Sequence, residues 1–204
     1  MMRIALALSF VALACSPRDE ASPKAAMTSR PAPTTPIDCR ALLTAWVVEG
    51  TLADSAHGIG QCTAADATAV LGDGEAGHGR LGGTGRDWTR WQRGEATVRA
   101  FWGADGHALL VVIDRPSAGD ASAWRARLGE PEATWPSRTK RMDWTIKDHV
   151  FAARGITASI GESLLEPPVA PSLQALYLYE PTTVDAYVSD LGGKDEWTRK
   201  FPLR

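Results

Sequence analysis

An internal repeat limits the possible folds of this chain more than any other feature of its 204 residues. Residues 111–117 align with residues 176–182, and each stretch is followed by a short helical pattern that ends in Leu-Gly. The tripeptide Asp-Trp-Thr also occurs once in each half. Self-similarity of this kind indicates a supersecondary unit that is used more than once. We therefore predict two related units, at about 63–118 and 119–183, with one helix before them and one after.

Each predicted unit is a helix followed by three strands. The first helix begins at Thr63, a residue type that caps helices, and ends at Gly72, because glycine readily adopts the left-handed conformation that terminates a helix. Apolar and polar residues alternate around Trp144, which is typical of a strand with one buried face and makes Trp144 a predicted core residue. Further helices are predicted at 38–49 and 183–191. The predicted fold is α+β, with one antiparallel sheet of about six strands and helices packed on one face.

The amino terminus has the pattern of a lipoprotein signal peptide. Arg3 supplies a positive charge, residues 4–14 are apolar but too few to span a bilayer, and the sequence Ala-Leu-Ala-Cys ends at Cys15. We expect residues 1–14 to be removed and Cys15 to carry the lipid. Ser16 then directs the protein to the outer membrane of a two-membrane bacterium. Cleavage by an ordinary signal peptidase, which would give a secreted soluble protein, is the alternative.

The segment after the lipidation site is predicted to be a disordered tether. Residues 15–36 contain five prolines and no aromatic residue, so they cannot bury enough apolar surface to offset their conformational entropy. Residues 37–204 then form a single α+β domain that contains both repeats. The net charge of −2 argues against a nucleic-acid partner, because such affinity comes mainly from neutralised phosphates. No second apolar run approaches the length of a membrane span, so we expect membrane contact through the lipid alone.

The other two cysteines form a natural pair. With Cys15 assigned to lipidation, Cys39 and Cys62 remain, and outside the cytosol a structural disulfide is the usual state of such a pair. Two free buried thiols are the alternative. A metal site is less favoured, because neither CxxC nor HxxxH spacing supplies further ligands. We therefore predict a disulfide between Cys39 and Cys62.

One combination of features resembles two known families. A short helix that ends in Leu-Gly-Glu-Pro at 128–131, then a strand with a tryptophan and an antiparallel ribbon, is duplicated in tandem behind a lipobox. This plan resembles the small outer-membrane lipoproteins of the barrel-assembly type and the tandem-repeat β-lactamase inhibitor proteins. The resemblance covers about residues 63–183 and transfers no functional residue. It implies a protein that binds other proteins and is not an enzyme.

The segment around Trp91 is the predicted binding face. If the other tryptophan of this strand is buried, alternation places Trp91 on the opposite face beside Thr89 and Arg93. An exposed tryptophan next to arginine is the composition of a binding hot spot. Tyr177 and Tyr179 are predicted to lie on the same outer face. The alternatives are that Trp91 packs beneath a loop and that the two tyrosines reflect β-propensity alone.

No motif in the chain predicts catalysis. Residues 77–82 match GxGxxG, but no strand is expected before them and no helix after them, so we predict a loop there and not a dinucleotide site. Gly-Glu-Ser at 161–163 lacks the glycine that completes a nucleophile elbow. The four histidines lie in different predicted elements, and their convergence with carboxylates in a deep pocket would indicate an enzyme.

The sequence therefore predicts a non-catalytic protein-binding module that is lipid-anchored in the cell envelope. Its partner is expected to be another envelope protein, and no catalytic residue, metal or cofactor is proposed. The alternatives are a secreted inhibitor or immunity-type protein, which differs in its partner, and an enzyme with an unrecognised site.

Overall fold

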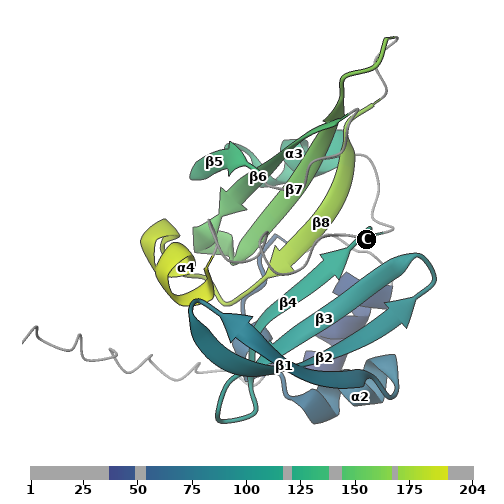
Figure 1. Cartoon of the computed structure of the whole chain (residues 1–204), viewed down its shortest axis with the longest axis vertical. Helices are drawn as coiled ribbons and strands as arrows, with labels where there is room; N and C mark the ends of the chain where they lie inside the picture. Colours follow the sequence, from purple (N-terminus) through teal and green to yellow (C-terminus); the bar gives the residue numbers. More distant parts are fainter. Residues whose placement is uncertain (1–36, 49–53, 117–120, 138–143, 167–169, 193–204) are drawn as a thin grey trace, which may run out of the picture. The chain divides into compact units, whose positions relative to one another are not determined.

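Eight strands in the described part of the chain form one antiparallel sheet, in the order β1-β2-β3-β4-β8-β7-β6-β5 (Figure 1). The computed structural model describes residues 37–48, 54–116, 121–137, 144–166 and 170–192, all within one unit of the chain. The strands are β1 (Glu75–Leu81), β2 (Thr84–Arg93), β3 (Ala96–Trp102), β4 (Ala108–Asp114), β5 (Ala133–Pro136), β6 (Trp144–Phe151), β7 (Ile156–Ser163) and β8 (Ser172–Leu178). The predicted signal peptide, the lipidation site Cys15 and the tether lie outside the described residues.

Four α-helices accompany the sheet in these residues, so the fold is α+β with a single antiparallel sheet, as predicted. The helices are α1 (Cys39–Leu43), α2 (Ala64–Leu71), α3 (Ala121–Leu128) and α4 (Val184–Leu191). A π-helical turn, η1 (Thr44–Val48), continues α1, and two 3-10 turns are η2 (Ile59–Gln61) and η3 (Ala152–Arg154). Within the described ranges, no helix has both the length and the apolar character needed to cross a membrane.

Local sequence signals set the ends of two helices. The Thr63 hydroxyl accepts a hydrogen bond from the backbone N–H of Asp66, whose carboxylate accepts one from the backbone N–H of Thr63. This capping box starts α2, which ends at Gly72 as predicted. Thr183 caps α4 through its hydroxyl, and Gly192 ends that helix with a φ of 68°. These signals act through neighbouring residues, so the sequence alone was sufficient to find them.

The prediction of six strands, three after each repeated helix, is wrong by two. Most of the predicted glycine-rich loop at 77–82 belongs to β1. All seven residues of β1 pair with β2, and this pairing makes the segment a strand. β5 has only four residues and pairs with β6. β6 is continuous through His149, where two shorter strands are predicted. In chain order, α2 and α3 are each followed by four strands.

Two apolar clusters lie on the two faces of the sheet. The first combines residues of α1, η1, α2 and α3 with one set of side chains from the central strands, for example Ile113 of β4. The second contains the alternate residue Val112, together with Tyr187 of α4. α4 therefore packs on the face opposite to α1–α3, and the prediction of helices on one face alone is wrong for α4. α4 packs there through an apolar stripe at i, i+3, i+4 and i+7, made by Val184, Tyr187, Val188 and Leu191.

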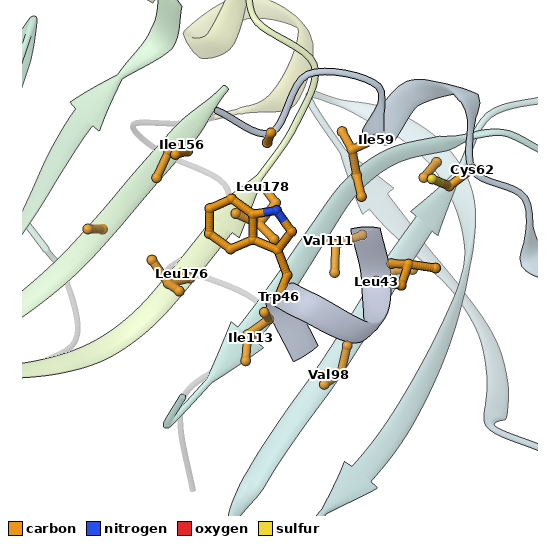
Figure 2. Packing of buried hydrophobic residues seen from close by; sticks show 14 of the residues in the cluster. Leu43, Trp46, Ile59, Cys62, Val98, Val111, Ile113, Ile156, Leu176 and Leu178 are labelled. Carbon is orange, nitrogen blue, oxygen red and sulfur yellow. The ribbon is translucent and has the colours of Figure 1, made fainter. Parts of the chain in front are cut away.

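The first cluster covers the seam at which the two halves of the sheet meet. At this seam β4 pairs with β8, from Val111 opposite Leu178 to Asp114 opposite Ala175. Trp46 of η1 lies over the seam among apolar side chains of both strands and is 3% exposed (Figure 2). Its ring centroid is 6.1 Å from that of a tryptophan on α3. The segment before β1 therefore helps to hold the two halves of the sheet together.

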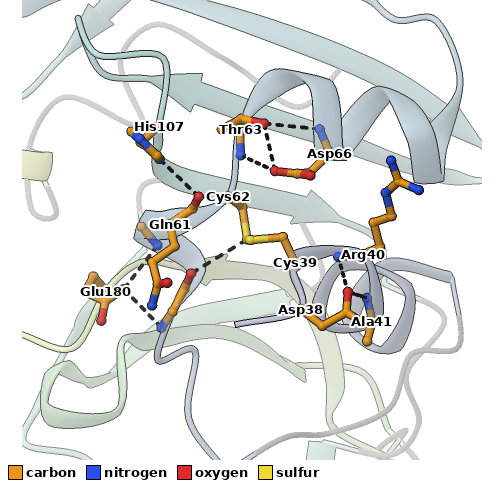
Figure 3. The surroundings of a disulfide bond; sticks show 12 residues. Asp38, Cys39, Arg40, Ala41, Gln61, Cys62, Thr63, Asp66, His107 and Glu180 are labelled. Carbon is orange, nitrogen blue, oxygen red and sulfur yellow. Dashed lines mark hydrogen bonds between the residues drawn. A yellow bond between two sulfur atoms is a disulfide. The ribbon is translucent and has the colours of Figure 1, made fainter. Parts of the chain in front are cut away.

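The predicted disulfide between Cys39 and Cys62 is present (Figure 3). It joins the first residue of α1 to the residue that follows η2, and the two Cα atoms are 5.3 Å apart. The Asp38 carboxylate caps α1 by accepting two backbone N–H groups of its first turn. Because α1 has only five residues, the disulfide and this cap are the local constraints that position Trp46 over the seam.

Candidate functional site

The sheet face that α1, α2 and α3 do not cover is named the outer face. Alternation along the strands decides which side chains lie on it. The outer face carries Glu75 on β1, Arg86, Trp88, Arg90 and Gln92 on β2, Thr97, Arg99 and Phe101 on β3, Asp114 on β4, Trp135 on β5, Trp144 and Asp148 on β6, Ser159 on β7 and Tyr177 on β8. α4 packs on one end of this face, where Tyr187 stacks on Tyr179 with ring centroids 4.4 Å apart.

The tryptophans are sorted by burial between the two sides of the sheet. Those on the helix side are buried, namely Trp46, Trp91, Trp102 and Trp124. Those on the outer face are half-buried, namely Trp88, Trp135 and Trp144. Trp135 also stacks on Tyr187 of α4, with ring centroids 6.4 Å apart. Every partly accessible tryptophan in the described residues therefore lies on the outer face.

A glycine makes room for Trp88 on the outer face. Gly77 of β1 is its cross-strand partner, and a Cβ atom at this position would collide with the indole ring. The guanidinium group of Arg99 lies over the same ring, 5.3 Å from the ring centroid, which is a cation–π contact. Gly77 and Arg99 together hold Trp88 in place without burying it.

Trp144 has a similar environment on β6. A Cβ atom added at Gly161 of β7 would lie 3.1 Å from Cε3 of the indole. The same atom would lie 3.2 Å from Cγ of Gln174 on β8. The tryptophan of each Asp-Trp-Thr tripeptide thus lies on the outer face beside a glycine. Trp144 is half-buried and not fully buried as predicted, although the predicted alternation is present, since Ile146 on the same side of β6 is buried.

A polar cluster surrounds a buried carboxyl group on β6, next to the edge strand β5. Asp148 is 6% exposed, and the Ser159 hydroxyl donates a hydrogen bond to its Oδ1. Burial raises the pKa of Asp148 to about 6, because loss of water disfavours the charged form, and the hydrogen bond from Ser159 opposes part of that rise. Burial also raises the pKa of Tyr177, and the negative charge of Asp148 adds to the rise. The charge on Asp148 therefore affects the pKa of Tyr177, its neighbour on the outer face.

The predicted exposure of Trp91 is wrong, and the outer face does not include Thr89 or Arg93, although Arg93 is exposed. Trp91 is 3% exposed, and its indole N–H donates to the carbonyl of Gly72 at 2.8 Å. Arg93 donates to a carbonyl of α2 at 3.0 Å, and Thr89 accepts a hydrogen bond from another buried indole at 3.0 Å. All three side chains lie on the helix side. Alternation along β2 is as predicted, but Trp88 is the tryptophan that faces outward, because α2 covers the other side.

The two predicted tyrosines have different positions. Tyr177 is half-buried on the outer face, as predicted. Tyr179 is completely buried, and its hydroxyl donates to the carbonyl of Ile156 at 3.2 Å. The prediction for Tyr179 is wrong because α4, which was predicted to pack on the same face as the other helices, covers this end of the outer face.

Three of the four histidines pair with different groups. His57 pairs with Glu180 at 2.9 Å, His78 with Asp87 at 2.8 Å, and His107 with the carbonyl of Gln61 at 3.0 Å. His149 lies on the helix side near Arg125 and Glu162, and burial lowers its pKa. Within the ranges that the structure describes, no three His, Cys, Asp or Glu side chains are grouped so that they could hold a metal ion.

Comparison with protein-family models, with curated proteins and with solved structures found no match to this chain. Its function is therefore inferred from the geometry of the outer face. Of the residues on that face, sequence reasoning identified Tyr177 but missed Trp88, Arg99 and Asp148. The tripeptide Asp-Trp-Thr relates Trp88 to Trp144, but it does not show which side of the sheet the helices leave uncovered, so the sequence pattern alone could not place Trp88 on the outer face.

Proposed function

We propose that this chain is a lipid-anchored envelope protein that binds another protein through its outer face, without catalysis. The observation that carries the proposal is the position of Trp88, Trp135 and Trp144, which are partly accessible on one face while the tryptophans of the helix side are buried. Tryptophan and arginine are the residue types most enriched at the energetic centres of protein interfaces. The outer face carries both residue types, with Trp88 beside arginines of β2 and β3.

The composition of the outer face also supports a protein partner. Arg90 and Gln92 are exposed on β2, and Thr97 lies half-buried beside them on β3. These side chains supply hydrogen-bond donors and acceptors next to aromatic surface. Interfaces between independently stable proteins have this mixed character, with apolar anchors surrounded by polar groups.

Two adjacent leucines extend the outer face at one margin. Leu164 and Leu165 follow β7 and are 63% and 50% exposed, and they are the exposed large apolar side chains within the described residues. They come directly after Ser163, whose cross-strand partner is Trp144. In Figure 1 the β7–β8 hairpin extends beyond the neighbouring strands. Adjacent apolar side chains at such a position add to a contact surface that begins at Trp144.

We also propose that the two halves of the domain are copies of one unit. The order of one helix followed by four strands occurs twice, and the last strands of the two halves, β4 and β8, pair at the centre of the sheet. This arrangement supports the resemblance to the tandem-repeat β-lactamase inhibitor proteins and to the barrel-assembly lipoproteins. It also places Trp88 and Trp144, one from each half, on the same face.

The anchor is tested by metabolic labelling with palmitate. We expect the wild-type chain to incorporate the label and to sediment with outer membranes, and the Cys15→Ser variant to do neither, because Cys15 supplies the acylated thiol. Processing without label in the wild type would contradict the anchor. That result would favour a secreted inhibitor or immunity-type protein that uses the same face.

The binding face is tested by replacing both Trp88 and Trp144 with alanine. We expect affinity for the protein that co-purifies with the wild-type chain to fall by at least about 30-fold, since truncating a hot-spot tryptophan costs about 2 kcal/mol or more. Surface plasmon resonance measures the affinity, and thermal melting checks the fold. The control is Thr134→Ala, an exposed position on the helix side of β5. Wild-type affinity in the double variant would contradict the proposed face.

A further inference from the structure

Charge is distributed unevenly over the outer face. On β2 and β3 it carries Arg86, Arg90 and Arg99, and the acidic residue in register with them on β1 is Glu75, which forms an ion pair with Arg90. The whole chain has a net charge of −2, so this group of arginines is opposite in sign to the net charge of the chain. Arg86, Trp88, Arg90 and Arg99 are named the arginine–tryptophan patch.

Two arginines of this patch oppose each other across neighbouring strands. Arg90 and Arg99 are cross-strand partners, and like charges in this position destabilise a sheet. Asp114 attracts Arg99, but burial raises the pKa of that carboxyl group, so its negative charge is itself costly. Burial lowers the pKa of Arg99, and the charge of Arg90 lowers it further. Two like charges are thus held close together on the outer face, where an anionic group of a partner would relieve their repulsion.

We propose that the arginine–tryptophan patch binds a polypeptide segment of the partner that carries carboxylates next to an aromatic or aliphatic side chain. This inference rests on the proposed function and specifies the chemistry of the partner. Arginine binds carboxylates through paired hydrogen bonds in a fixed geometry. Trp88 lies between Arg86 and Arg90 on the same side of β2, so its ring offers apolar contact between two carboxylate-binding groups. A sulphated polysaccharide would match the charge but would leave the indole without an apolar partner.

Calorimetry with synthetic copolymers tests the charge of the partner segment. One copolymer contains glutamate and tyrosine, and the other contains lysine and tyrosine; each is titrated into the full chain. We expect the glutamate–tyrosine copolymer to bind and to lose at least about tenfold in affinity between about 0.05 M and 0.5 M salt, because salt screens exposed charges. We expect no binding of the lysine–tyrosine copolymer.

Charge-reversal variants locate the binding on the molecule. Arg86→Glu with Arg90→Glu is expected to weaken the glutamate–tyrosine copolymer by at least about tenfold, since two carboxylate contacts are lost and repulsion is added. Arg80→Glu is the matched control, because Arg80 is exposed on β1 but points to the helix side. It should change the affinity by less than about twofold. If the double variant has a lower melting temperature than the wild type, the affinity of Arg86→Gln alone is compared with that of the wild type.

Several outcomes would overturn the inference. These are no binding of the glutamate–tyrosine copolymer, equal binding of both copolymers, or an equal loss in the Arg80→Glu control. Heparin that binds more tightly than the copolymer and is unaffected by Trp88→Ala would identify a general polyanion site instead. Binding of the lysine–tyrosine copolymer alone, lost in Trp88→Ala, would overturn the acidic partner and leave the proposed function standing. The proposed function itself fails if no protein contacts the outer face in cells.

Discussion

At about pH 7.5, replacing Asp148 by asparagine is expected to raise the free energy of unfolding by up to about 3 kcal/mol. Burial raises the pKa of this carboxyl group from 3.8 to about 6, so at neutral pH the folded protein holds a charge where it is disfavoured. Asparagine has nearly the same shape and no charge, and its Oδ1 still accepts the hydrogen bond from Ser159. The variant therefore removes the cost of the charge and keeps the packing.

The effect has a defined pH window. Because the pKa of Asp148 is higher in the folded than in the unfolded chain, the folded state binds the proton more tightly, and stability falls as the pH rises from 3.8 through about 6. Above that range the loss is complete. At about pH 4 only about 0.5 kcal/mol of the difference should remain, and below about pH 3 the carboxyl group is protonated in both states, so the variant and the wild type should be equally stable.

Urea unfolding at about pH 4, 5, 6 and 7.5 measures this difference. Asp73→Asn serves as the control, because Asp73 is exposed. The free energy of unfolding of this variant should stay within about 0.5 kcal/mol of the wild-type value at each pH. A gain for Asp148→Asn that is undiminished at about pH 4 would indicate packing and not charge. A variant less stable than the wild type at about pH 7.5 would contradict the cost assigned to the buried carboxylate.

Replacing Cys39 and Cys62 together by alanine is expected to lower the free energy of unfolding by about 3 kcal/mol. The disulfide links residues that are 23 apart in the sequence, and closing a loop of that size restricts the unfolded chain by about this amount. Alanine is the suitable replacement because both positions are buried. The variant also releases α1, so weaker packing of Trp46 over the seam adds to the loss.

Urea unfolding with and without a reducing agent measures the contribution of the disulfide. Reducing agent should bring the unfolding midpoint of the wild type to that of the double variant and should leave the double variant unchanged. Equal midpoints for the oxidised wild type and the variant would contradict the stabilisation assigned to the bond. The rate of trypsin cleavage after Arg40 provides a local readout, because the disulfide and the Asp38 cap constrain this segment.

Features that depend on neighbouring residues were predicted well from the sequence. The cap at Thr63, the helix end at Gly72 and the final helix predicted at 183–191 each depend on residues close together in the sequence, and all three are present. The pairing of Cys39 with Cys62 followed from the cysteine count once Cys15 was assigned elsewhere. These predictions needed no knowledge of which strands pair.

Features that depend on strand pairing were not predictable in the same way. Gly77 lowers the β-propensity of β1, and the advantage of glycine there is visible only when Trp88 is placed opposite it. Alternation shows that Trp88 and Trp91 lie on opposite sides of β2, but not which side α2 covers. The cluster around Asp148 is assembled by β6, β7 and β8 and has no sequence motif.

Photo-crosslinking in intact cells tests most directly whether the outer face contacts a protein. A photoreactive phenylalanine analogue replaces Gln92 or Leu164 at the outer face and its margin, or Arg80 or Thr134 on the helix side, and all four positions are exposed. We predict that Gln92 and Leu164 crosslink to the same envelope protein, that Trp88→Ala abolishes these crosslinks, and that Arg80 and Thr134 give no comparable product. Crosslinks confined to the helix-side positions, or none from the outer-face positions, would contradict a binding function for this face.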